Sequence, residues 1–107
     1  MAQLGIILVS FPFTDITSVK QRPAIVLLDT GDEDVVVTRV TSQPVQTPFD
    51  VEIIKWQQAG LLVPSIIRVH KIATIEKRLI MRRLGMLRDN DWAQMCAVIR
   101  QLWQQFL

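Results

Sequence analysis

The stretch that decides the fold is Pro64-Ser-Ile-Ile-Arg-Val-His-Lys-Ile-Ala-Thr-Ile-Glu76, which predicts a β-strand from Ile66 to Ile72 that runs into a turn. Side chains alternate between the two faces of a strand. One face is therefore expected to carry Ile66, Arg68, His70 and Ile72. Next-but-one residues lie roughly 6.5–7 Å apart along a strand, so Arg68 and His70 would be separated by about the width of one phosphate group.

This pair of side chains suggests chemistry at a phosphodiester. Arginine presents a planar fork of donors to phosphate, and histidine exchanges protons near neutral pH. His70 is the only histidine in the chain. The alternative is a solvated polar face on an edge strand, and periodicity by itself favours that alternative.

Working outward, five further short strands are predicted at residues 5–11, 24–28, 35–41, 49–54 and 79–84. Because proline has no backbone N–H, the pair Arg22-Pro23 predicts a strand start at a sheet edge. The acidic segment from Asp29 to Asp34 predicts a hairpin turn, and residues 55–60 predict one helical turn that ends at Gly60. A polar connection from Phe13 to Gln21 is a candidate lid over a site.

From Asp91 the apolar residues follow helical spacing. Asp89, Asn90 and Asp91 are expected to supply capping oxygens and negative charge at the start of this helix. With no alternation of strands and helices, the order predicts a mainly β fold, a small curled antiparallel barrel with a C-terminal helix packed on it. The 107 residues are expected to form a single domain, 1–107.

Charge is distributed unevenly along the chain. Residues 1–60 carry four basic and seven acidic residues, a net −3, whereas residues 61–107 carry eight basic and three acidic residues, a net +5. A basic half raises the expectation of a polyanionic partner. A single cysteine and the absence of a long apolar stretch or a secretory signal predict a cytoplasmic protein.

The sequence offers little for metal or cofactor chemistry. One histidine and one cysteine on different elements do not make a metal site, and Asp50 with Glu52 is a pair of carboxylates without a third ligand. No glycine-rich phosphate loop and no nucleophile elbow is present in the sequence. We therefore expect any enzymatic activity to proceed without metal or organic cofactor.

Several separated blocks together resemble the PemK/MazF-like toxin family of type II toxin-antitoxin systems. They are Gly5-Ile-Ile-Leu-Val-Ser-Phe-Pro-Phe-Thr-Asp15, Lys20-Gln-Arg-Pro-Ala-Ile-Val-Leu27, Val40-Thr-Ser-Gln43, Trp56-Gln-Gln-Ala-Gly-Leu61, Ser65-Ile-Ile-Arg68, Lys71-Ile-Ala-Thr74 and Leu84-Gly-Met-Leu87. The resemblance implies an SH3-like barrel with a C-terminal helix, a homodimer, and a growth-arresting endoribonuclease that a cognate antitoxin inhibits. It also implies metal-independent cleavage of single-stranded RNA to 2′,3′-cyclic phosphate and 5′-hydroxyl ends.

The resemblance assigns roles residue by residue. Arg22 matches the catalytic arginine of the family. Thr41 and Ser42 match a polar pair that contacts the scissile phosphate, and Arg68 matches an arginine that acts as general acid or phosphate stabiliser in part of the family. His70 stands where an acidic residue is common, so we hypothesise that it carries proton transfer. Lys20, Ser42, Gln43 and Lys71 are the residues expected to contact RNA.

The chain departs from the family pattern at Ile6, where many members have an acidic residue, as well as at His70. Two other functions stay open on the same fold. One is a catalytically weak barrel that binds nucleic acid or an antitoxin and has a regulatory role. The other is a gyrase poison directed at DNA, which the retention of Arg22, Thr41 and Ser42 makes the least favoured of the three.

Overall fold

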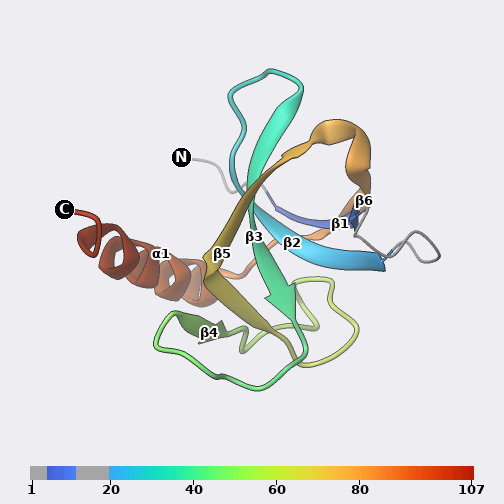
Figure 1. Ribbon diagram of the computed structural model, residues 1–107. Helices are drawn as coiled ribbons and strands as arrows, with labels where there is room; N and C mark the ends of the chain where they lie inside the picture. Colours follow the sequence, from blue (N-terminus) through green and yellow to red (C-terminus); the bar gives the residue numbers. More distant parts are fainter. Residues whose placement is uncertain (1–4, 12–19) are drawn as a thin grey trace.

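The computed structural model describes residues 5–11 and 20–107 of the chain. Its elements are β1 (Ile6–Phe11), β2 (Lys20–Leu28), β3 (Asp34–Thr41), β4 (Asp50–Glu52), β5 (Ile66–Glu76), the 3₁₀ helix η1 (Lys77–Leu79), β6 (Ile80–Gly85) and α1 (Asp89–Gln104). The strands form one antiparallel sheet in the order β4-β5-β3-β2-β1-β6 (Figure 1). The predicted mainly β fold with a C-terminal helix is confirmed.

Hydrophobic side chains pack on both faces of the sheet. Neighbouring residues Ile6 and Ile7 belong to different buried clusters, as expected for strand residues that point to opposite faces. The first cluster includes Met95 and Val98 of α1, and the helix contacts β5 and β4. The second cluster lies on the face away from α1 and includes Ala24, Val37 and further residues of β1, β2, β3 and β5. This second face is the one that carries the candidate site.

The turn after β4 connects the two ends of the sheet. Gly60 has a φ of 93°, and the backbone N–H of Leu61 donates to the carbonyl of Trp56 at 3.0 Å, so the predicted helical turn ended by Gly60 is confirmed. A Cβ on Gly60 would lie 2.1 Å from the carbonyl oxygen of Leu84. A Cβ on Gly85 would lie equally close to a carbonyl of the turn. Among the described residues, the curled sheet is therefore completed by backbone contact between two glycines, and not by pairing of β4 with β6.

The predicted edge position of Arg22-Pro23 is wrong for the strand as a whole, because β2 lies in the middle of the sheet and begins at Lys20. Pro23 pairs with Leu8 of β1, but the pairing of β2 with β3 starts only at Ala24. The proline therefore lies in a part of β2 that has a paired strand on one side only. A residue without a backbone N–H is tolerated at such a position.

The alternation predicted for residues 66–72 holds from Ile66 to Val69, since Ile67 and Val69 lie in the same cluster, but it is wrong beyond them, because β5 contains a large irregularity. Thr38 of β3 pairs with Ile72, whereas the next residue, Arg39, pairs with Arg68. Paired residues share a face and adjacent residues do not, so Arg68 and Ile72 lie on opposite faces. The Oγ1 of Thr38, a fully buried residue, donates to the carbonyl of Arg68 at 2.9 Å and stabilises the irregular segment.

At the start of α1 the predicted capping is wrong in part. Asp89 and Asp91 do place negative charge in the first turn, but no side chain caps the helix. The buried carboxylate of Asp91 instead accepts hydrogen bonds from the backbone N–H groups of Ile54 and Lys55, both at 3.0 Å. These bonds attach the helix to the turn after β4.

The part of the predicted lid at residues 13–19 lies outside the described residues. The hairpin turn predicted between Asp29 and Asp34 is confirmed, since it joins β2 to β3 and has Gly31 at a φ of 93°. Within residues 5–11 and 20–107, no helix combines the length and apolar character needed to cross a membrane.

Candidate active site

A pocket of about 320 Å³ opens on the face of the sheet away from α1 and is lined by cations from three neighbouring strands. Arg22 comes from β2, Arg39 from β3 and Lys71 from β5. The remaining lining residues are apolar: Ala24, Val37, Ile72, Ala73 and Ile75. Register explains the convergence, because Ala24 pairs with Arg39 and Val37 pairs with Ala73.

The electrostatics of this pocket are strongly positive. Arg22, Arg39 and Lys71 are all exposed, and none forms an ion pair with any carboxylate of the described residues. Convergent uncompensated cations attract anions and raise their local concentration. The pocket therefore suits a phosphate group carried by a ligand with an apolar part.

Thr41 lies two residues after Arg39 on β3, so both point to the same face at a separation of roughly 6.5–7 Å. Its Oγ1 accepts a hydrogen bond from the backbone N–H of Gln43 at 3.3 Å. Ser42 and Gln43 line a second hollow of about 410 Å³, together with residues that include Trp56 and Ser65. β3 thus carries Arg39 in the cationic pocket and ends directly before two polar residues of the second hollow.

Arg68 lines neither of these two hollows, and the donors of its guanidinium are already bound. Its Nη1 donates to the Oδ2 of Asp50 at 2.7 Å, and its Nη2 donates to the Oε1 of Gln43 at 3.2 Å. The exposed fraction of the side chain is 8% for Arg68 and 0% for Asp50. The guanidinium is therefore a buried structural group in this conformation, and it orients Gln43.

Asp50 is held as a carboxylate by its donors. Burial raises the pKa of Asp50. Hydrogen bonds from the backbone N–H groups of Gln46 and Thr47, at 2.8 and 3.0 Å, and the charge of the Arg68 guanidinium lower it. The pKa therefore lies below the usual aspartate value. All three donors meet Oδ2, whereas the buried Oδ1 has no partner among the described residues. Nowhere in the described ranges do three histidine, cysteine or acidic side chains come together in a way that could hold a metal ion.

His70 does not share the surroundings of Arg68. It lies in the irregular segment of β5, and its ring packs against Phe49 with centroids 6.0 Å apart. Its Nδ1 is buried and has no hydrogen-bond partner in the described part of the chain. Phe49 itself packs against the cluster on the helix side of the sheet, so the predicted neighbourhood of Arg68 and His70 on one face is not formed.

The residues predicted for the site therefore lie in different places in the structure. Arg22 and Lys71 line the cationic pocket, Ser42 and Gln43 line the second hollow, and Gln43 hydrogen-bonds both Thr41 and Arg68. His70 has separate contacts, with Phe49. Lys20 is the first residue of β2, where its backbone pairs with Phe11.

Two residues of this region were not predicted as part of a site. Arg39 is the third cation of the pocket, and the signal for it was its place two residues before Thr41 on a strand. Asp50 binds Arg68 from 18 residues away, and no spacing in the sequence indicates that pairing.

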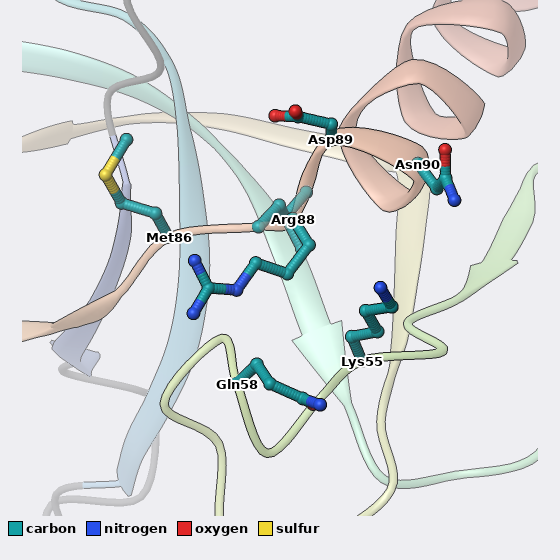
Figure 2. Close-up of a pocket in the computed structure, with 7 residues that line it drawn as sticks. Lys55, Gln58, Met86, Arg88, Asp89 and Asn90 are labelled. Atoms are coloured by element: carbon teal, nitrogen blue, oxygen red, sulfur yellow. The ribbon is translucent and has the colours of Figure 1, made fainter.

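A larger hollow of about 770 Å³ lies elsewhere, between the turn after β4 and the segment that joins β6 to α1. Figure 2 shows Arg88 extending over this turn, which carries Lys55 and Gln58. None of the predicted site residues lines it. Size alone therefore does not identify the candidate active site.

Comparison with known proteins agrees with this fold. A Mycobacterium tuberculosis toxin, MazF-mt6, matches with a TM-score of 0.77 at 18% identity, over 94% of this chain and 96% of that chain. A mycobacterial endoribonuclease in complex with its cognate antitoxin matches with a TM-score of 0.74 at 13% identity, over 94% of this chain and 93% of that chain. No curated protein matches the sequence. The profile of the PemK-like, MazF-like toxins matches residues 2–103, so the chain belongs to this family of type II toxin-antitoxin toxins.

Proposed function

We propose that the protein is a metal-independent endoribonuclease that cleaves single-stranded RNA, acts as a growth-arresting toxin, and is inhibited by a cognate antitoxin. The observation that carries the proposal is the pocket in which Arg22 and Lys71 converge beside the strand that bears Thr41. Family membership supports it, as does the fold shared with a protein described as an endoribonuclease in complex with its cognate antitoxin.

The proposed reaction is a transesterification at phosphorus. The ribose 2′-oxygen forms a bond to phosphorus, the bond from phosphorus to the 5′-oxygen breaks, and the products carry a 2′,3′-cyclic phosphate and a 5′-hydroxyl. A base takes the proton of the 2′-hydroxyl, and an acid returns a proton to the leaving 5′-oxygen. The phosphorane oxygens gain negative charge, which nearby cations and donors stabilise.

Each residue has a role in this proposal. Arg22 stabilises the phosphorane, and Thr41 with Ser42 donates hydroxyl hydrogen bonds to the phosphate. Arg68 acts as a positioning residue through Gln43, since its donors are occupied by Asp50 and Gln43. Lys20, Gln43 and Lys71 bind the RNA. His70 carries proton transfer in this proposal, which requires its ring to leave the contact with Phe49 and reach the pocket.

The partners follow from the same charges. An acidic, partly disordered antitoxin segment would compete with RNA for the cationic pocket, because both are polyanionic. We further propose a homodimer that acts in the cytoplasm on messenger RNA, with a preference for particular sequences.

The test is cleavage of single-stranded RNA by the purified protein in EDTA. The expected result is cleavage by the wild type, with Arg22→Ala and Thr41→Ala each slowing it by about 100-fold or more, the usual effect of removing one donor to a developing oxyanion. Arg100→Ala and Thr30→Ala are matched controls, because both residues are exposed and lie outside the two hollows. Equal rates for Arg22→Ala and Arg100→Ala would refute the proposed site.

A binding module without turnover is the second candidate, and the occupied guanidinium of Arg68 favours it. The same assay separates the two functions. Retention of RNA on the protein with no new ends in the RNA would support the module, whereas cyclic-phosphate ends support the enzyme.

A further inference from the structure

Of the three cations that line the pocket, two have a proposed role in RNA cleavage or binding and one does not. Arg22 has a proposed role from the family resemblance and Lys71 has one from its charge, whereas Arg39 has none. Arg39 lies directly opposite Arg68 in the pairing of β3 with β5. Like charges directly opposite one another in a sheet are destabilising, so two arginines at this position require compensation.

Only one member of the arginine pair is compensated. Asp50 neutralises Arg68 through an ion pair with an N–O distance of 2.7 Å, and both partners are almost fully buried. Arg39 is exposed and makes no ion pair with any carboxylate in the described ranges. Its charge adds to those of Arg22 and Lys71, so three positive charges surround a pocket of about 320 Å³. A bound polyanion would relieve this repulsion.

The rest of the pocket indicates what accompanies the anion. Ala24 and Ala73 are small, so they leave space between the cations, and Val37 and Ile75 make the surface apolar. An apolar floor with a few convergent polar groups is typical of sites for small ligands with flat apolar parts. A nucleobase has an apolar face of this kind, and its phosphate would lie among the arginine forks at the rim.

We propose that Arg39 is an RNA-binding residue, which holds a phosphate next to the one that Arg22 contacts while the attached base lies against the apolar floor of the pocket. This inference rests on the proposed function and extends it by one residue and one nucleotide subsite. Arginine is suited to this role because its fork can donate two parallel hydrogen bonds to one phosphate.

The test measures binding to a single-stranded RNA of mixed sequence in which every 2′-hydroxyl is methylated, so that it cannot be cleaved. Fluorescence anisotropy is recorded at several salt concentrations for the wild type, Arg39→Ala, Arg39→Lys and the control Arg100→Ala. We expect Arg39→Ala to weaken binding roughly tenfold and to reduce the slope of log K against log salt by about 0.7, the value for one phosphate contact on a single strand. Arg39→Lys should restore the slope, because it restores the charge.

The inference is overturned if Arg39→Ala binds RNA with the same affinity and salt slope as the wild type. It is also overturned if the wild type does not bind RNA at all. Because Arg39 is exposed, the variant is expected to fold, and its urea midpoint checks this. The outcome is separable from that of the proposed function. If Arg39→Ala loses affinity but the wild type leaves unmethylated RNA intact, the subsite stands and the nuclease proposal fails. If the wild type cleaves RNA and Arg39→Ala binds like Arg100→Ala, the nuclease stands and the subsite fails.

Discussion

The ion pair of Asp50 with Arg68 should be a main determinant of stability, and the substitution Asp50→Asn tests this. The carboxylate is completely buried, and its Oδ2 accepts from Arg68 at 2.7 Å and from the backbone N–H groups of Gln46 and Thr47. An asparagine keeps one acceptor oxygen but loses the charge. The substitution therefore leaves Arg68, whose side chain is 8% exposed, without a counter-charge.

The expected cost follows from the burial of both partners. Removing one partner of a buried ion pair typically costs 3–5 kcal/mol, because the remaining charge is desolvated and unpaired. We take the lower end, about 3 kcal/mol, since the asparagine oxygen can still accept one of the backbone bonds. At roughly 4 °C per kcal/mol for a domain of this size, the midpoint of thermal unfolding should fall by about 12 °C.

The same carboxylate predicts a pH dependence. The pKa of Asp50 is lower in the folded protein than the ordinary value of about 3.9, so the unfolded chain binds its proton more readily. The stabilisation is therefore fully present above the ordinary value and is lost as the pH falls through the folded pKa. The difference in stability between the wild type and Asp50→Asn should be constant near neutral pH and should narrow on acidification below about pH 4.

The assay is urea unfolding followed by the fluorescence of the tryptophans, of which Trp56 and Trp92 pack against the core. Asp29→Asn is the matched control, because Asp29 also forms an ion pair, with Lys77 at 2.8 Å, but is exposed, and it should leave the midpoint essentially unchanged. In Asp50→Asn combined with Arg68→Met, most of the loss should be recovered, since no unpaired charge remains. A cost below about 1 kcal/mol for Asp50→Asn would refute the reasoning.

Three further predictions concern the sheet closure, the helix attachment and the histidine. In urea unfolding, Gly60→Ala should lower the free energy of unfolding by about 3 kcal/mol, because its Cβ would lie 2.1 Å from the carbonyl oxygen of Leu84. The control Gly31→Ala has the same φ of 93° but no atom within 4 Å of its Cβ, so it should cost only about 1 kcal/mol. Asp91→Ala should cost about 2 kcal/mol of unfolding free energy in the same assay, because two backbone N–H groups lose their acceptor. Asp89 is exposed, so Asp89→Ala should cost much less. Equal effects of the two substitutions would contradict the attachment of α1 through Asp91. His70→Ala should lower the rate of RNA cleavage and change its pH profile, and an unchanged rate and profile would remove His70 from the mechanism.

The elements that follow from local patterns were predictable from the sequence. The apolar spacing after Asp91 indicated α1, Gly60 indicated the end of the helical turn, and the acidic, glycine-containing composition of residues 29–34 indicated the hairpin. The features that depend on contacts between distant segments were not predictable. The irregularity in β5 is stabilised by a hydrogen bond from Thr38 to the carbonyl of Arg68, 30 residues away in the sequence. This irregularity places Ile72 on the opposite face from the one predicted.

The candidate site likewise has residues that the sequence predicted and residues that it did not. Arg22 and Lys71, both named as site residues from the sequence, line one pocket. The third cation of that pocket, Arg39, was recognisable only once β2, β3 and β5 were in register. Arg68 was expected to face a phosphate and is instead bound to Asp50, because a buried guanidinium needs a counter-charge and β4 brings one alongside. Long-range pairing decides which charges are free, and the sequence does not reveal it.

The most direct test of the central claim is the chemistry of the RNA ends. Single-stranded RNA is incubated with the wild-type protein in EDTA, and the same RNA with deoxyribose at the mapped cleavage position is incubated in parallel. The account predicts 2′,3′-cyclic phosphate and 5′-hydroxyl ends from the first RNA and an intact second RNA, because the attacking 2′-hydroxyl is then missing. Cleavage of the deoxy-substituted RNA at that position, or products that carry 5′-phosphates, would contradict it.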